Sequence, residues 1–249
     1  MAIEGRSRES ADGRVRLGMV GGGEGAFIGA VHRLAARMDD HYTFVAGALS
    51  STPDKAKRSG AALGLAPDRV YSDYEAMAKA EAKRPDGIEA VSIVTPNHMH
   101  APVAKAFLKA GIHVICDKPL TTSLKEALSL QKAAAASKRL FAVTYNYTGY
   151  PMVRHARAMI AAGELGELRV VQAEYPQDWL TERLEASGQK QAAWRTDPKQ
   201  SGAGGCIGDI GTHAYDLASF VSGLTLDSLS ADLTSFVKGR KLDDNVHIM

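Results

Sequence analysis

The chain has 249 residues, 45% of them hydrophobic and 23% charged, which is enough apolar material to bury the core of one large or two modest domains. Its 30 Lys and Arg residues nearly balance 28 Asp and Glu residues, and the cations are scattered along the chain, which argues against a nucleic-acid partner. No stretch approaches the roughly 20 apolar residues that span a bilayer, and the first residues do not resemble a signal peptide, so we expect a cytoplasmic protein with no membrane partner.

The first part of the chain alternates apolar strands with helices. Residues 1–13 are mostly polar, and we expect them to form a disordered tail. Beyond them, near-continuous apolar runs predict five buried strands, at residues 15–20, 42–49, 90–95, 113–117 and 140–147. Apolar residues at helical spacing predict helices between these strands, at residues 29–38, 54–64, 73–84, 101–111 and 123–138. This alternation is typical of an α/β fold with a doubly wound parallel sheet, which we assign to residues 14–147.

The second part of the chain follows a different pattern. A predicted helix at 150–166 leads into an alternating segment at 168–175 that predicts a strand, and a long polar stretch follows at 176–205. The remaining pattern predicts a helix at 209–222 and two further strands, at 229–237 and 245–249. We expect residues 148–249 to form an α+β domain with an open, mainly antiparallel sheet. Because the last strand meets the end of the chain, we expect this domain to be incomplete.

A glycine-rich segment joins the first predicted strand to the first helix. Glycines at this junction let backbone N–H groups and the helix N-terminus approach a pyrophosphate, as in a Rossmann domain. Gly21 and Gly23 supply the first two glycines of the G-x-G-x-x-G/A pattern, and either Ala26 or Gly29 supplies the third position. The alternative is a glycine-rich turn that binds no ligand. The residues expected to hold the cofactor here are Gly21, Gly23, Gly25, Ala26, Phe27 and Ile28.

The end of the second predicted strand bears on the choice of cofactor. A carboxylate is expected there for NAD, because it pairs with the ribose hydroxyls. Ser50 and Ser51 stand there instead, with Lys55 and Arg58 close behind. Hydroxyls and cations tolerate a 2′-phosphate, so the sequence favours NADP weakly over NAD. Asp54 is near enough in sequence to reach the ribose, and the two cations are equally consistent with a solvated helix face.

Two further loops follow predicted strands and should meet at the same edge of the sheet. The carboxyl ends of the strands border the ligand crevice in open α/β sheets. We expect cofactor contacts there from Thr95, Pro96, Asn97, His100, Asp117 and Lys118. Lys118 lies between a strand and a proline, which restricts its backbone. Its ammonium could polarise a substrate hydroxyl or carbonyl, although an isolated lysine in a turn is as often a surface residue.

A candidate acid–base group lies on the predicted helix near the end of the chain. Asp209, His213 and Asp216 share one helical face at spacings of four and seven residues. A histidine with an ordinary pKa can take a hydroxyl proton, and a nearby carboxylate can orient the imidazole. The plainer alternatives are a helix cap at Asp209 and a structural histidine. The two cysteines, Cys116 and Cys206, form no ligand cluster, and we expect no metal.

Taken together, these segments resemble the Gfo/Idh/MocA family of NAD(P)-dependent oxidoreductases. The resemblance is carried by VRLGMVGGGEGAFIGAVH, VSIVTPNHMHAPVAKAFLKAGIHVICDKPL, AWRTDPKQSGAGG and GDIGTHAYDLASF. The family's Glu-Lys-Pro motif falls on residues 117–119, with Asp117 in place of the glutamate. The resemblance implies catalytic roles for Lys118, His213 and Asp209, with Asp209 as the partner of His213.

The resemblance implies further contacts and partners. The family's Trp-Arg segment falls on Trp194 and Arg195, which implies that both lie near cofactor and substrate, while Tyr145 and Asn146 are implied substrate contacts alongside the three catalytic residues. Family members continue beyond the point at which this chain ends and form dimers or tetramers, which implies a C-terminally truncated copy of a homodimer or homotetramer.

The function implied is hydride transfer between a nicotinamide cofactor and a secondary hydroxyl or ketone of a sugar, cyclitol or related polyol. Two alternatives remain open from the sequence. One is a glycosidase that uses bound NAD to oxidise its sugar transiently, and the other is a dinucleotide-binding sensor without catalysis. The intact Lys118, Asp209 and His213 argue against the sensor.

Overall fold

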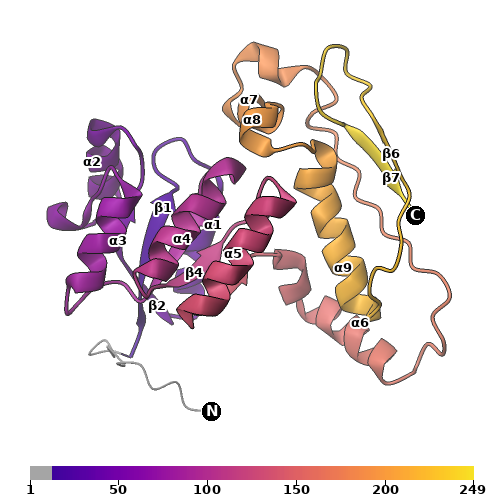
Figure 1. The fold of residues 1–249 in the computed structure, drawn as a ribbon, viewed down its shortest axis with the longest axis horizontal. Coiled ribbons are helices and arrows are strands. Elements are labelled where there is room, and N and C mark those ends of the chain that lie inside the picture. The colour runs from indigo at the N-terminus through magenta and orange to yellow at the C-terminus, as the bar shows by residue number, and fades with distance from the viewer. Residues whose placement is uncertain (1–12) are drawn as a thin grey trace. The chain divides into compact units, whose positions relative to one another are not determined.

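The computed structural model describes residues 13–249, and the tail expected at residues 1–13 falls almost wholly outside them. The described chain divides into two compact units (Figure 1). The first unit holds residues up to 95, together with 99–120 and 124–143. The second holds residues 96–98, 121–123 and 144–249.

The first unit is built on a five-stranded sheet in which every neighbouring pair is parallel. In the order of the sheet, the strands are β2 (Tyr42–Ala48), β1 (Val15–Gly21), β3 (Ala90–Val94), β4 (His113–Cys116) and β5 (Phe141–Val143). The doubly wound parallel sheet predicted from the apolar runs is therefore confirmed. The order also places β1 beside β3, so the loops that follow these two strands leave the same edge of the sheet.

Helices connect the strands as the crossovers of a parallel sheet require. They are α1 (Ile28–Met38), α2 (Pro53–Ala62), α3 (Tyr74–Lys83), α4 (His100–Lys109) and α5 (Leu124–Ser137), with short 3₁₀ turns η1 (Pro67–Arg69) and η2 (Asn97–Met99). Helix α4 packs between α3 and α5 (Figure 1). Its end is defined by Gly111, which takes a φ of +78° while the N–H of Ile112 donates to the carbonyl of Phe107, so a left-handed glycine closes the helix.

The core of this unit lies between β3 and the helix that follows it. Every residue of β3 is buried, and Val91 and Ile93 have no exposed surface. Val103 and Phe107 on α4 are equally buried and belong to the same apolar cluster. A strand covered on both faces needs apolar side chains in both directions, which explains why the strand sequences show no polar alternation.

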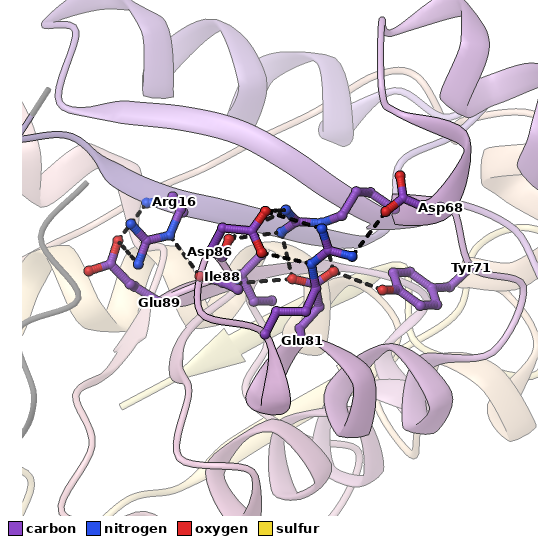
Figure 2. Close-up of polar contacts among 10 residues, drawn as sticks. Arg16, Asp68, Tyr71, Glu81, Asp86, Ile88 and Glu89 are labelled. Atoms are coloured by element: carbon purple, nitrogen blue, oxygen red, sulfur yellow. Dashed lines mark hydrogen bonds and ion pairs between the residues drawn. The ribbon is translucent and has the colours of Figure 1, made fainter. Parts of the chain in front are cut away.

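A buried ion-pair network fixes α3 against the segments on either side of it. The carboxylate of Glu81, which has no exposed surface, accepts hydrogen bonds from Arg69 at 2.9 and 2.6 Å. The hydroxyl of Tyr71 also donates to it at 2.8 Å, and the backbone N–H of Ile88 at 3.1 Å (Figure 2). Tyr71 keeps its proton, since burial and Glu81 raise its pKa to about 12. Four donors on one carboxylate join α3 to η1 and to the chain that enters β3.

The second unit is mainly helical. Its elements are η3 (Asn146–Gly149), α6 (Pro151–Ala161), η4 (Leu184–Ser187), α7 (Lys190–Arg195), α8 (Pro198–Ser201), the π-helical turn η5 (Ile207–Gly211), α9 (Thr212–Ser222), β6 (Ala231–Thr234) and β7 (Asn245–Ile248). Strands β6 and β7 pair antiparallel, with Ala231 opposite Ile248 and Thr234 opposite Asn245. The antiparallel sheet expected in this part of the chain is confirmed over these two strands.

One expectation for the second unit is wrong, and one stretch contains helices that the sequence pattern does not indicate. Residues 168–175 were predicted to form a strand from their alternating pattern, but the structure has no strand there, and Val170 is 83% exposed. Alternation describes the side chains alone, whereas a strand also needs the backbone hydrogen bonds of a neighbour. The polar stretch at 176–205, for which the sequence pattern indicates no particular element, contains α7 and α8. Asp197 caps α8 by accepting from the N–H of Lys199, a local signal that short helices depend on.

No helix within residues 13–249 is long and apolar enough to cross a membrane.

The network around Glu81 predicts a large loss of stability when its charge is removed. Glu81→Gln leaves the buried guanidinium of Arg69 without its bidentate partner, and we expect the free energy of unfolding to fall by about 3 kcal/mol. Urea denaturation followed by circular dichroism measures this change. Glu75→Gln is the matched control, because Glu75 forms only an exposed pair with Lys79 on the same helix and should cost less than about 0.5 kcal/mol. Equal losses for both variants would contradict this account.

Candidate functional site

The glycine-rich loop between β1 and α1 brings three backbone segments unusually close together. A Cβ atom added at Gly21, whose φ is +84°, would lie 2.8 Å from the carbonyl oxygen of Val94 in β3. A Cβ at Gly23 would lie 2.5 Å from the carbonyl oxygen of Leu49. A Cβ at Gly29 would lie 2.4 Å from the Cα of Gly22. These contacts require glycine, because no side chain fits between the backbones.

The contacts also distinguish the two alignments of the glycine pattern. The third glycine of such a loop permits close packing of helix against strand. Gly29 makes that approach, whereas Ala26 lies within the loop, where its N–H donates to the carbonyl of Gly23. The loop is therefore extended by residues 24–27 before α1 begins at Ile28, and Phe27 at its tip is 67% exposed.

The end of β2 presents two serine hydroxyls, as the sequence predicts. An ion pair beside them was not predicted. Ser50 accepts a hydrogen bond from the N–H of Thr52, and Ser51 is exposed. Lys55 lies half-buried in the first turn of α2. Arg58, the second cation of this group, pairs at 3.2 Å with Glu24 of the glycine loop. A carboxylate inside the loop thus already holds one of the cations expected to tolerate a 2′-phosphate.

The loops after β3 and β4 are joined through a buried histidine. The Nδ1 atom of His100 lies 2.7 Å from the carbonyl oxygen of Pro119, and its Nε2 atom lies 2.9 Å from that of Thr95. The ring is 1% exposed, so His100 presents neither nitrogen to a ligand. The backbone of Asp117 is held by the carbonyl of Ile93, and Lys118 is half-buried between Asp117 and the buried Pro119.

Asn97 was expected to contact the cofactor, together with its neighbour Pro96. The structure assigns both to the second unit. Asn97 is 5% exposed, and its amide nitrogen donates to the carbonyl of Ser201 at 3.1 Å. The side-chain amide of Asn97 is therefore engaged in fixing the backbone at Ser201.

Three tyrosines surround His213 in the second unit. His213 lies in the first turn of α9 and is 7% exposed. The centroid of its ring lies 4.9 Å from that of Tyr147, 5.8 Å from that of Tyr145 and 6.3 Å from that of Tyr175. The hydroxyls of Tyr147 and Tyr175 are hydrogen-bonded to each other, which together with burial raises the pKa of Tyr147 to about 12. Burial raises the pKa of Tyr145 as well, so neutral phenols face the imidazole.

The His213 cluster borders an open hollow of about 520 Å³. Its polar lining includes His213, Tyr147 and Tyr175, together with Gln172, Glu174 and Ser222. Its apolar lining comes from α6, α9 and the segment at 168–175, and includes Ile160, Leu168, Val170, Val171, Leu217 and Val221. The hollow combines a few hydrogen-bonding groups with a largely hydrocarbon surface, as small-molecule sites commonly do.

Asp209 and Arg195 form an ion pair that neither the helical spacing nor the resemblance predicts. The Nε atom of Arg195 donates to Asp209 at 3.1 Å, and its Nη1 atom donates to the side chain of Gln191 at 2.6 Å. The guanidinium also stacks on Trp194, 4.2 Å from the ring centre, with Trp179 further away at 5.8 Å. Asp209 lies in the π-helical turn that precedes α9. The predicted residues Trp194, Arg195 and Asp209 are thus brought together.

The remaining residues have simpler surroundings. Asn146, an expected substrate contact, donates to the hydroxyl of Tyr150 at 3.4 Å. Asp216 lies on α9, and burial raises the pKa of its carboxyl. Within the described part of the chain, no group of three or more His, Cys, Asp or Glu residues could hold a metal ion.

Sequence reasoning missed Glu24, Tyr147 and Tyr175. Tyr147 is the last residue of the strand predicted at 140–147 and stands two residues from Tyr145, which was a usable signal. Tyr175 and Glu24 carried none, because their importance comes from partners 28 and 34 residues away.

Comparison with known proteins places both parts of the chain in one family. Residues 15–145 match the NAD-binding Rossmann-fold domain of the Gfo/Idh/MocA oxidoreductases, and residues 153–249 match the C-terminal domain of the same family. The chain is 37% identical over 241 residues to an uncharacterized oxidoreductase, YfiI, of Bacillus subtilis. The match covers 94% of this chain and 61% of that protein. A levoglucosan dehydrogenase of Pseudarthrobacter phenanthrenivorans is 30% identical, with 92% of this chain and 56% of the relative covered.

A solved structure shows the same relationship. The crystal structure of an inositol dehydrogenase homolog from Azotobacter vinelandii, complexed with NAD+, superposes with a TM-score of 0.90 at 42% identity. The match covers 94% of this chain and 61% of that one, so the chain spans about three fifths of the length of such relatives. With both domain models matched, the chain belongs to the Gfo/Idh/MocA family of oxidoreductases.

Proposed function

We propose that this protein transfers a hydride between a nicotinamide dinucleotide and a secondary hydroxyl or ketone of a sugar, cyclitol or related polyol. The observation that carries the proposal is the buried imidazole of His213, set among three tyrosines at the border of an open hollow. Relatives support the substrate class: one Azotobacter homolog was solved with NADH and myo-inositol, and a levoglucosan dehydrogenase with NADH and levoglucosan.

The glycine loop fits the cofactor. Its backbone approaches so closely at Gly23 and Gly29 that a Cβ atom would collide, which is the arrangement that brings N–H groups and a helix N-terminus to a pyrophosphate. We propose that the loop from Gly21 to Ile28 holds the pyrophosphate, and that Ser50, Ser51 and Lys55 face the adenosine ribose. When bound, the nicotinamide supplies or accepts the hydride.

In the proposed mechanism, the chain's own residues handle the proton and the developing charge. His213 takes the proton from the substrate hydroxyl, the role of general base that histidine side chains most often fill. Lys118 steadies the negative charge that develops on the oxygen, and the neutral tyrosines donate hydrogen bonds. Asp209, paired with Arg195, fixes the π-helical turn from which α9 and His213 begin.

Removing either proposed catalytic side chain should abolish most of the turnover. We expect His213→Ala and Lys118→Ala each to lower kcat by a factor of about 10²–10⁴, the usual contribution of a positioned acid–base group. Absorbance of the reduced cofactor, followed with a panel of sugars and inositols, measures this. His155→Gln, at an exposed position on α6, is the control and should keep full activity.

Three outcomes would contradict parts of this proposal. Undiminished turnover in either alanine variant would overturn the mechanism. Cleavage of a glycoside without net cofactor reduction would favour the glycosidase alternative. Cofactor binding without turnover of any polyol would favour the sensor.

The close approach at the glycine loop gives a separate prediction about binding. Gly23→Ala forces the loop away from Leu49, so we expect the dissociation constant for NAD to rise at least about tenfold, or about 1.4 kcal/mol. Isothermal titration calorimetry measures it. Gly149→Ala is the matched control, since a Cβ there meets nothing within 4 Å. Unchanged affinity in Gly23→Ala would show that the dinucleotide does not use this loop.

The weak preference for NADP expected from Ser50 and Ser51 depends on Arg58, which Glu24 holds. Glu24→Gln releases this guanidinium, and we expect NADP to bind up to about fivefold more tightly while NAD is unaffected, in keeping with the modest strength of an exposed ion pair. Parallel titrations with both cofactors measure the ratio. A Glu75→Gln control should leave the ratio unchanged, and an unchanged ratio in Glu24→Gln would remove Arg58 from the phosphate site.

A further inference from the structure

One buried imidazole bridges the two loops that leave the carboxyl edge of the sheet. His100 opens α4, yet its ring turns inward and is 1% exposed. Nδ1 lies 2.7 Å from the carbonyl oxygen of Pro119, which follows β4, and Nε2 lies 2.9 Å from that of Thr95, which follows β3. The two loops are thus connected through one side chain as well as through the strands.

The chemistry of this bridge requires a side chain that donates hydrogen bonds. A carbonyl oxygen only accepts, so the neutral ring, with its single N–H, donates to one of the two carbonyls at a time, and the protonated ring donates to both. Burial lowers the pKa of His100 against the opposing effect of the two carbonyls and of Asp117, while Lys118 lowers it further. An apolar residue of similar size would leave both carbonyls without this donor, and such buried groups are costly to leave unsatisfied.

A second histidine approaches the same turn from α1. The Nδ1 atom of His32 lies 2.8 Å from the hydroxyl of the buried Ser92 in β3, and its Nε2 atom lies 3.8 Å from a carboxylate oxygen of Asp117. His32 therefore stands beside the residue before Lys118, and His100 holds the residue after it.

We propose that His100 is a positioning residue that fixes Lys118: it ties the Pro119 carbonyl after β4 to the Thr95 carbonyl after β3 and so sets the direction in which the lysine side chain leaves the turn. This inference rests on the proposed function, because it gives Lys118 its place in the reaction. It replaces the expectation that His100 itself contacts the cofactor, since both ring nitrogens face backbone carbonyls.

The role predicts a specific pattern of kinetic loss. His100→Gln keeps one donor and should lower kcat about tenfold, and His100→Leu keeps none and should lower it about 100-fold, the order of loss that misplacing a reacting group by about 1 Å produces. The dissociation constant for NAD should change less than about twofold in both variants. His41→Gln, an exposed histidine in the same unit, is the control and should match the unsubstituted protein.

A double-mutant cycle separates positioning from general structural damage. If His100 acts through Lys118, substituting it in a Lys118→Ala background should lower the residual kcat by less than about twofold, since the two effects are then coupled. An equal loss in both backgrounds would overturn the proposal, as would a change in NAD affinity with kcat intact. Should His100→Leu fail to fold, the same cycle is decided with His100→Gln.

An activity-independent measurement distinguishes failure of this inference from failure of the proposed function. Amide hydrogen exchange across residues 117–121 should be at least about tenfold faster in His100→Gln than in His41→Gln, because the turn loses a tether. Unchanged exchange would overturn the positioning role whatever the enzyme's substrate. Faster exchange in a protein that reduces no cofactor with any polyol would instead contradict the proposed function alone.

Discussion

The contact of backbone with backbone at the end of β1 is the constraint on which the rest of the candidate site depends. Gly29 meets Gly22 and Gly23 meets Leu49 at distances that no side chain permits. Because α1 can start this close to the sheet, its N-terminus lies at the edge where β3 also ends. The parallel order of β1, β3 and β4 then delivers three loops to one edge of the first unit.

The polar groups at that edge are held by buried side chains instead of by contacts with solvent. His100 joins the loops after β3 and β4, and Glu81 secures the chain that enters β3 from the opposite end. In the second unit the same principle applies around His213, whose ring lies beside Tyr147, with its pKa raised by the hydrogen bond to Tyr175 and by burial, and Tyr145, with its pKa raised by burial. Each unit thus holds an imidazole in a fixed position, and groups that are already oriented need little reorganisation when charge develops in a reaction.

Much of this could be predicted from the sequence, and the limits have physical causes. Unbroken apolar runs identified the parallel strands because burial on both faces leaves a local signature. Whether Ala26 or Gly29 fills the third position of the glycine pattern could not be predicted from local sequence, because it depends on how far the loop extends before α1 packs on the sheet. The same holds for the pairing of Arg195 with Asp209, 14 residues apart, and of Tyr147 with Tyr175. The apolar and polar residues at 168–175 do alternate, but the predicted strand is absent because alternation does not supply the hydrogen-bonding neighbour that a strand needs.

The most direct test of the central claim is a crystal structure of the protein grown with NAD. We predict that the pyrophosphate lies within hydrogen-bonding distance, about 2.7–3.2 Å, of backbone N–H groups between Gly21 and Ile28. The nicotinamide should then lie beside the loops that contain Thr95 and Lys118. A dinucleotide bound with its pyrophosphate away from the glycine loop would contradict the account.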